Sequence, residues 1–178
     1  MLKMFKRIAI IGCPGSGKTY MTKQLQSILN IPIYHLDQYY FYPNWQKVEL
    51  EKFLKSHKDI CDTSQWIIDG QALVSLRYRL EKADCVIFLD IPRIKCLISV
   101  IKRTVTNIGR PAPGSPAGCI QYIFSLEFLK FLHSIWSFNK TRPIILDMIN
   151  FFQNKKQIYI IKSRNDVVKI LNKFRNHR

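Results

Sequence analysis

The chain has 178 residues, of which 47% are apolar and 12% aromatic, so it can bury one sizeable core and fits a single domain. No apolar run reaches the roughly 18 residues that a membrane span needs. The five cysteines are odd in number and none has Cys-x-x-Cys spacing, which disfavours both a disulfide framework and a metal site. We therefore expect one cytoplasmic domain over residues 1–178.

The chain is strongly basic, with 28 Lys and Arg against 12 Asp and Glu and a formal net charge of +16. Such an excess attracts polyanions at long range, and it would equally surround a site for small phosphorylated substrates. The basic residues are spread along the sequence, without the interleaved aromatics of a base-stacking platform. Nucleic acid is therefore a candidate partner beside a small anionic substrate.

The first expected strand is the apolar stretch 7–11, and it runs into a motif with the spacing Gly, four residues, then Gly-Lys-Thr. The motif reads Gly12-Cys13-Pro14-Gly15-Ser16-Gly17-Lys18-Thr19. Its glycines let the backbone turn tightly, so that successive N–H groups point inward at the start of a helix and can donate to phosphate oxygens. Apolar residues at helical spacing follow as far as Asn30, which disfavours the alternative of a Gly-Pro-rich hairpin.

This loop predicts a nucleoside triphosphate, ATP or another, bound with Mg²⁺. Lys18 is expected to reach the β- and γ-phosphates, and the hydroxyl of Thr19 is expected to ligate the metal. The remaining expected nucleotide-binding positions of the loop are Gly12, Pro14, Gly15, Ser16 and Gly17.

The second expected strand, 31–36, ends at Asp37, and the carboxyl ends of parallel strands face the ligand. Asp37 is a candidate base or anchor for an acceptor, or alternatively a cap of the next turn. His35 is expected to be packed rather than catalytic. The segment 38–62, an aromatic turn followed by an amphipathic helix, is predicted to form the acceptor side; its aromatics wall an acceptor pocket or pack over the sheet edge.

The third strand, 66–70, closes with Asp69 and Gly70. A carboxylate at the end of a buried strand beside a phosphate loop can organise Mg²⁺ through water, and the glycine permits close backbone approach at the acceptor side. An ordinary turn aspartate is the alternative. The next helix carries Arg77 and Arg79 on opposite sides of an apolar stripe, so only one of them is expected to face the ligand.

The strand 83–90 is followed by an expected helix over 93–107 and by the stretch 109–118, which holds three glycines and three prolines. We expect residues 103–120 to form a mobile lid over the triphosphate. Arg103 and Arg110 would then neutralise charge on the transferred group or stack on the base, unless they are ordinary surface arginines.

Helices over 121–138 and 142–152, a strand over 157–161 and a final helix capped by Ser163 and Asp166 complete the chain. Five strands alternate with helices, and the phosphate loop follows the first. This pattern predicts a three-layer, doubly wound α/β fold with a parallel sheet.

The chain resembles the P-loop kinases of the nucleoside monophosphate kinase (adenylate kinase-like) group, and among them the bacterial DNA topology modulation protein (FlaR-like) family. The residues that carry the likeness are Ile11 to Lys18, Tyr34 to Asp37, Trp66 to Gly70, Arg79-Leu80, Ala83-Asp84, Phe88 to Asp90 and Arg142-Pro143. The chain departs from that family at Gln71-Ala72, where relatives have Asn-Tyr.

The resemblance implies the sheet order 2-3-1-4-5 with a helical lid insertion. It also implies that Lys18 and Thr19 serve the nucleotide and Mg²⁺, Asp69 the metal, Arg79 the acceptor and Arg103 the lid. The acceptor-binding residues are thus expected to be Asp37, Gly70 and Arg79.

We accordingly expect an ATP-dependent phosphotransferase with catalytic contributions from Lys18, Asp37, Arg103 and Arg110, acting on a small acceptor. A phosphorylated acceptor needs only arginines to hold it, whereas a hydroxyl acceptor needs a carboxylate within reach. The alternatives are a nucleic-acid-binding regulator of DNA topology whose nucleotide site is a switch, and a polynucleotide end kinase.

Overall fold

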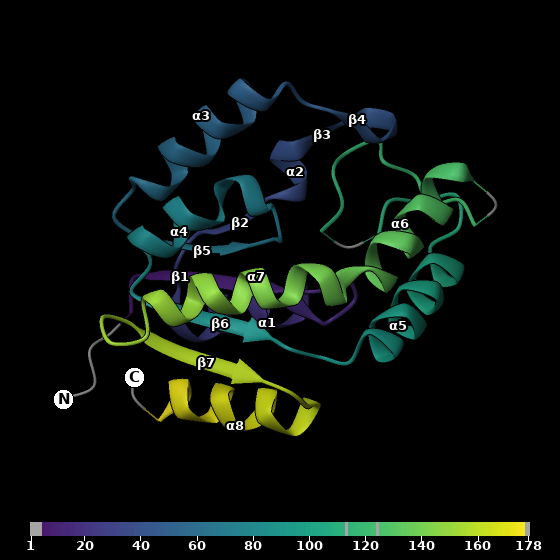
Figure 1. Ribbon diagram of the computed structural model, residues 1–178. Coiled ribbons are helices and arrows are strands. Elements are labelled where there is room, and N and C mark those ends of the chain that lie inside the picture. The colour runs from purple at the N-terminus through teal and green to yellow at the C-terminus, as the bar shows by residue number, and fades with distance from the viewer. Residues whose placement is uncertain (1–4, 113, 124, 177–178) are drawn as a thin grey trace.

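A computed structural model describes residues 5–112, 114–123 and 125–176 (Figure 1). Residues 1–4, 113, 124, 177 and 178, which the predicted domain, lid and helix 121–138 include, lie outside the described residues. The fold is built on a five-stranded sheet whose paired strands are all parallel, with the order β2-β5-β1-β6-β7. The strands are β1 Arg7–Gly12, β2 Ile33–His35, β5 Trp66–Asp69, β6 Cys85–Leu89 and β7 Gln157–Ile161. Counted along the chain, this is the predicted order 2-3-1-4-5, and the predicted α/β class is confirmed.

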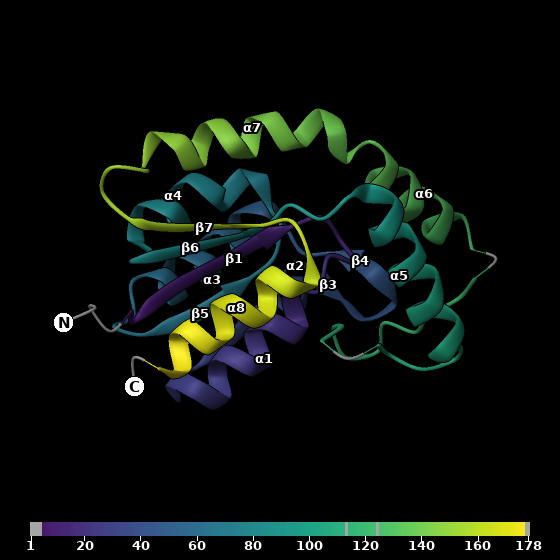
Figure 2. The same ribbon diagram turned by 90° about the horizontal axis from the view of Figure 1, so that it is seen from below.

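Helices cover both faces of the sheet (Figure 2). On one face lie α1 (Lys18–Leu29) and α8 (Arg164–Arg175), and on the other α3 (Leu50–Cys61), α4 (Leu76–Lys82) and α7 (Phe138–Phe151). Successive strand residues point to opposite faces, so Ile8 and Ile10 join the core under α1, while Ala9 and Ile11 join the core under α4 and α7. Burial on both faces explains why the strands read as continuous apolar runs.

The segment after β2 contains more than the predicted turn and helix. A short α2 (Asp37–Tyr40) leads into a two-stranded antiparallel hairpin, β3 (Phe41–Tyr42) and β4 (Gln46–Lys47), whose tip is the 3₁₀ turn η1 (Pro43–Trp45). The helix α3 follows. The helix expected after Gly70 begins as the 3₁₀ turn η2 (Leu73–Ser75) and continues as α4.

The predicted helices over 121–138 and 142–152 are wrong in their boundaries. The first is α6 (Leu126–Trp136), because the hydroxyl of Ser125 accepts the N–H of Phe128 and caps the helix there. The second, α7, begins at Phe138, whose side chain is buried in the core, and Pro143 lies inside it. The start of α6 thus follows a local cap, whereas the start of α7 follows the tertiary burial of Phe138.

The remaining helix of the described chain is α5 (Arg93–Thr106), which lies close to its predicted span. Between α5 and α6 the described residues form turns and an isolated bridge from Ile108 to Gln121, so the lid segment itself is not helical there. The predicted cap of the last helix is confirmed, because Ser163 Oγ accepts the N–H of Asp166. No helix in the described ranges has the length and apolar character to cross a membrane.

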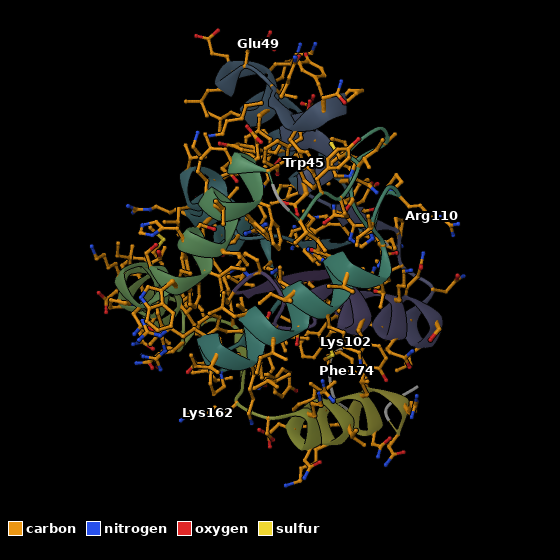
Figure 3. The ribbon with its side chains drawn as sticks, turned by 90° about the vertical axis from the view of Figure 1, so that its right-hand side faces the viewer. Trp45, Glu49, Lys102, Arg110, Lys162 and Phe174 are labelled. Carbon is orange, nitrogen blue, oxygen red and sulfur yellow. The ribbon has the colours of Figure 1, made fainter. Side chains whose placement is uncertain are left out.

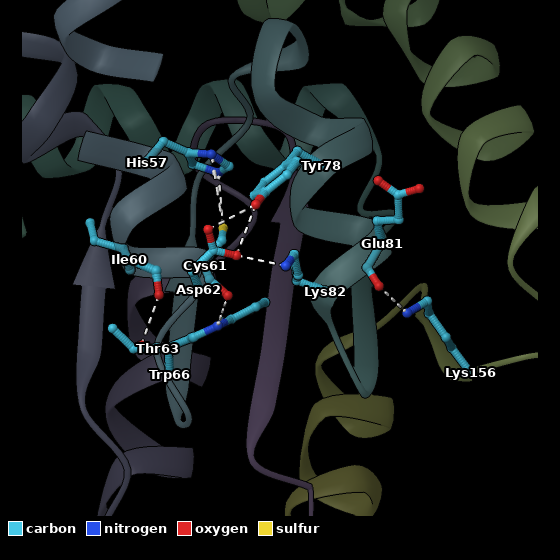
Figure 4. Close-up of polar contacts among 10 residues, drawn as sticks. All are labelled: His57, Ile60, Cys61, Asp62, Thr63, Trp66, Tyr78, Glu81, Lys82 and Lys156. Carbon is cyan, nitrogen blue, oxygen red and sulfur yellow. Dashed lines mark hydrogen bonds and ion pairs between the residues drawn. The ribbon is translucent and has the colours of Figure 1, made fainter. Parts of the chain in front are cut away.

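The contact between α3 and α4 holds a buried histidine (Figure 4). The ring of His57 is almost fully buried, and its Nε2 lies 3.6 Å from the Sγ of Cys61. At the exposed end of the same contact, Asp62 accepts a hydrogen bond from the hydroxyl of Tyr78 (2.8 Å) and pairs with Lys82 (2.6 Å). Burial and, to a smaller extent, the charge of Arg79 lower the pKa of His57 to about 4.

We expect His57 to make the fold sensitive to acid. The unfolded chain takes up this proton near the ordinary pKa of 6.5, while the folded chain keeps the ring neutral down to about pH 4. The contribution of neutral His57 to the free energy of unfolding is therefore fully present above pH 6.5. It decreases by about 2–3 kcal/mol as the pH falls toward 4. Urea unfolding at pH 7 and pH 4.5 should show a smaller acid loss for His57→Gln than for the wild type. Equal losses would contradict this assignment.

Candidate functional site

The glycine motif forms the connection between β1 and α1 at the centre of the sheet. Gly15 has φ +85°, and a Cβ built on it would lie 2.4 Å from the carbonyl oxygen of Cys96 and 2.8 Å from Cγ2 of Val100, both on α5. Gly17 has φ +97° with open space around it. The first glycine is therefore required both by its backbone conformation and by the close approach of α5, and the second by conformation alone.

Lys18 begins α1, and its side chain folds back over the loop. Its Nζ donates to the carbonyl oxygens of Gly12 (2.9 Å) and Cys13 (3.0 Å). Burial lowers the pKa of Lys18, while the charges of Asp37 and Asp69 raise it. A phosphate in the loop would compete with these two carbonyls for the ammonium group.

Two buried polar atoms beside the loop make no hydrogen bond to any described residue. They are Oγ of Ser16, in the loop, and Nε of Arg103, on α5. Buried donors without a partner carry a free-energy cost of about 1–3 kcal/mol each, which a ligand that accepts hydrogen bonds would remove. Both atoms therefore fit a site for an anion.

Asp69 ends β5 and is held in place by two neighbours that the sequence did not single out as its partners. Its Oδ2 accepts the hydroxyl of Thr22 (2.8 Å) and faces Nδ1 of His35 (2.8 Å). The hydrogen bond to Asp69 raises the pKa of His35, against the opposing effect of burial. The signal for Thr22 is its spacing from Lys18, because four residues place it one turn further along α1. His35 is packed, as expected.

The structure leaves Asp69 Oδ1 without a hydrogen bond from any described residue. The carboxylate therefore has one oxygen fixed by Thr22 and His35 and one oxygen for a ligand or a metal-bound water. Thr19, the other predicted metal ligand, is partly buried in the first turn of α1. Among the described residues no group of three or more His, Cys, Asp or Glu side chains could hold a metal ion, so a metal here would depend on the nucleotide for its remaining ligands.

Asp37 follows β2 at the same end of the sheet and remains accessible to solvent. The surrounding protein removes much of the bulk water around the carboxylate, and this desolvation raises its pKa. Lys18 and Arg103 lie close enough for their charges to oppose that rise, and Asp37 in turn opposes the lowering of the Arg103 pKa by burial. Asp37 thus lies within range of the charges of both Lys18 and Arg103.

The segment after α5 lies over the start of α1 and is joined to the β3–β4 hairpin. A Cβ built on Gly114 would lie 3.0 Å from Cγ2 of Thr19. The N–H of Asn44 donates to the carbonyl of Gly118 (3.2 Å), and Nε1 of Trp45 donates to that of Ile120 (3.0 Å). The segment predicted to form a lid is therefore packed against the first turn of α1 and hydrogen-bonded to the β3–β4 hairpin.

The structure does not bring two of the predicted arginines to this group. Arg110 is exposed and points away from the body of the protein (Figure 3). Arg79 is fully buried and donates to the carbonyl of Gly70 (3.0 Å), and its Nε and the other terminal nitrogen have no partner among the described residues. Burial lowers the pKa of Arg79 to about 10. Of the pair predicted to lie on opposite sides of α4, Arg77 is the exposed one.

The chain matches no protein-family model and no curated protein sequence. Solved structures share its fold. Shikimate kinase from Acinetobacter baumannii in complex with shikimate has 14% identity and a TM-score of 0.61, over 98% of this chain and 96% of that one. Shikimate kinase from Bacteroides thetaiotaomicron has 13% identity and a TM-score of 0.62, over 97% and 98%. An unliganded sugar kinase from Janibacter sp. has 13% identity and a TM-score of 0.52, over 97% and 91%.

These neighbours show that the chain shares the three-layer α/β fold of these solved structures, as the sequence predicted. They do not single out the DNA topology modulation protein family, so that finer assignment stays a prediction. At 13–14% identity they carry the fold and leave the chemistry to be argued from the residues.

The two loop glycines give a matched pair of substitutions. Gly17→Ala should cost about 1–2 kcal/mol, because only the left-handed backbone opposes a Cβ there. Gly15→Ala should cost an additional 1–3 kcal/mol or so, because its Cβ also meets the backbone of α5. Urea unfolding of the two variants beside the wild type measures the difference. A loss for Gly17→Ala as large as that for Gly15→Ala would contradict the close packing of the loop on α5.

Proposed function

We propose that this protein is an ATP-dependent phosphotransferase that transfers the γ-phosphoryl group to a hydroxyl of a small molecule. The observation that carries the proposal is that Asp37, at the carboxyl end of the sheet, lies within range of the charges of Lys18, in the glycine loop, and Arg103, on α5. A solvent-accessible carboxylate within range of two cations provides a proton acceptor near groups that stabilise negative charge.

The triphosphate would lie in the loop formed by Gly12, Pro14, Gly15, Ser16, Gly17, Lys18 and Thr19. Pro14 has no N–H and serves the shape of the loop, while the other residues can donate main-chain N–H groups. The Ser16 hydroxyl and the Nε of Arg103 would gain phosphate oxygens as partners. Lys18 would exchange two carbonyls for the β- and γ-phosphates.

Mg²⁺ fits this site through the hydroxyl of Thr19 and the remaining oxygen of Asp69, the latter through water. When bound, the ion would neutralise charge on the phosphates. Thr22 and His35 would act indirectly, by fixing the orientation of the Asp69 carboxylate.

The acceptor follows from what the arginines can do. A phosphorylated acceptor needs accessible arginines, but Arg79 is buried and its hydrogen bond goes to Gly70. We therefore assign Arg79 to holding the Asp69-Gly70 turn in place. Asp37 remains as the accessible group, and a carboxylate is what a hydroxyl acceptor requires. The neighbours described as shikimate and sugar kinases support a small-molecule acceptor.

In the proposed reaction the acceptor oxygen attacks the γ-phosphorus in line with the bond to the β-phosphate oxygen. The new O–P bond forms as the old one breaks, the acceptor proton passes to Asp37, and ADP leaves with the bonding electrons. Lys18 and Arg103 stabilise the charge that develops on the transferred group. The lid segment, anchored at Thr19 and at the hairpin, limits the access of water.

The direct test is acceptor-stimulated release of ADP from Mg-ATP, measured with a panel of hydroxyl metabolites, nucleosides, nucleoside monophosphates and oligonucleotides with 5′-hydroxyl ends. Stimulation by a small hydroxyl compound is the expected result. Stimulation by monophosphates alone, or by oligonucleotide ends alone, would replace the proposed acceptor class with the corresponding alternative.

Asp37→Asn distinguishes the acceptor classes at the level of mechanism. With a hydroxyl acceptor we expect kcat to fall about 10²–10⁴-fold, because the proton acceptor is removed. The pKa of Asp37 is raised, so the wild-type carboxylate gains a proton at a higher pH than an ordinary aspartate does. We therefore expect kcat to decline as the pH falls through the raised pKa of Asp37. The exposed carboxylate of Asp59, on α3, provides the control Asp59→Asn, which should leave kcat unchanged. Near-normal turnover of Asp37→Asn would argue against hydroxyl transfer.

A further inference from the structure

An apolar surface covers the outer side of α5 and α6, away from the proposed active site. Its seven side chains are each 45–61% exposed: Ile94, Ile98, Ile101, Val105, Leu126, Leu129 and Trp136. Along α5 their spacing is four, three and four residues, which aligns them in one stripe. We call these seven residues the α5–α6 face.

The two helices form one continuous surface. The terminal nitrogen NH1 of Arg93, in the first turn of α5, donates to the carbonyl of Trp136 (3.1 Å), in the last turn of α6, and the guanidinium lies 4.1 Å from the centre of the indole ring. Leu97 of α5 and Phe128 of α6 pack against the core beneath the face. The helices lie side by side in Figures 1 and 2. Exposed apolar groups gathered in this way mark an interaction surface rather than scattered surface residues.

The same stretch of chain is almost free of acidic residues. From Arg93 to Trp136 the sequence has six basic residues and a single acidic one, Glu127, although the whole chain has 12 Asp and Glu. The basic residues are Arg93, Lys95, Lys102, Arg103, Arg110 and Lys130. Lys95 and Lys102 are exposed on α5 next to the apolar stripe, and Figure 3 shows Lys102 on this side of the protein.

The basic charge beside the α5–α6 face distinguishes between the partners that could bind there. A second copy would bring two such basic surfaces together, each on a chain of net charge +16, and like charges oppose that association. Nucleic acid would match the charge but would leave the aliphatic stripe without a partner. An anionic lipid surface matches both features, because headgroups attract the lysines while the isoleucines and leucines enter the boundary with the acyl chains.

We propose that the α5–α6 face binds the surface of membranes that contain anionic lipids. The two helices would lie in the membrane–water interface and would not cross the bilayer. The tryptophan at one end of the face and the lysines beside it are the residue types that occupy such interfaces. The inner side of α5 contacts the phosphate loop at Gly15 and carries Arg103 toward Asp37. Membrane binding would therefore leave the proposed active site open, and it does not depend on the proposed reaction.

The test is sedimentation of the full chain with sucrose-loaded vesicles of phosphatidylglycerol and phosphatidylcholine, compared with vesicles of phosphatidylcholine alone. Binding to the anionic vesicles, weaker at high salt and at least tenfold weaker without the anionic lipid, is the expected result. Ile98→Ser/Ile101→Ser should lower the partition coefficient at least about tenfold. The control Phe151→Ser/Val168→Ser removes comparable exposed apolar surface from α7 and α8 and should bind as the wild type does.

A second pair of variants tests the charge. Lys95→Glu/Lys102→Glu should remove most of the preference for anionic vesicles, whereas Lys169→Glu/Lys173→Glu, on α8, should retain it. Light scattering in the absence of lipid gives the oligomeric state of the same samples. A wild-type dimer that Ile98→Ser/Ile101→Ser converts to monomer would overturn the proposal in favour of a second copy. No vesicle binding by a folded, monomeric wild type would also overturn it, as would equal loss in the Phe151→Ser/Val168→Ser control.

Discussion

The pairing of β1 with both β5 and β6 is the constraint on which the rest of this structure depends. It places β1 at the centre of the sheet, with four residues in register with β5 and five with β6. The glycine loop leaves the carboxyl end of this central strand, so it lies between the ends of its neighbours. The position of Asp69 beside the loop follows from the register of β5 with β1, in which Asp69 pairs with Ile10. The loop and the carboxylates meet because parallel strands end at one edge.

Helix α5 connects the parts that the sheet alone does not join. Its inner side packs on Gly15 so closely that no side chain fits, and Arg103, one turn from its end, reaches the neighbourhood of Asp37. The chain that follows passes over Thr19 and is bonded to the hairpin at Asn44 and Trp45. One helix thus links the glycine loop, Asp37 and the segment predicted to form a lid, while its outer side carries the apolar face.

The sequence was sufficient for the strands, the phosphate loop and the fold class, because continuous burial and a fixed glycine spacing are local signals. The strand order came from a family resemblance and is confirmed, although no pattern within a strand encodes it. The start of α6 was missed although its signal is local, because Ser125 caps the N–H of Phe128 only three residues further on. The start of α7 was missed because it depends on the burial of Phe138, which is a tertiary contact.

Some features of the candidate site could not be predicted from the sequence because they depend on tertiary packing. Arg77 and Arg79 differ little in local sequence, and only the packing of α4 shows that Arg79 is buried against Gly70. The hydrogen bonds of Asp69 join residues 34 and 47 positions apart, which no spacing rule anticipates. Roles in binding and catalysis remain predictions for all of these residues.

The measurement that tests the central claim most directly is titration calorimetry of Mg-ATP into the wild type and Lys18→Ala, with both chains shown to be folded by circular dichroism. For the wild type, the account predicts a heat of binding with one site per chain. For Lys18→Ala it predicts no binding, or binding weakened at least about a hundredfold, because the Lys18 ammonium is the only side-chain cation that the loop offers to the phosphates. A folded wild type that shows no binding heat and no competition by ADP, or a variant that binds as tightly as the wild type, would contradict it.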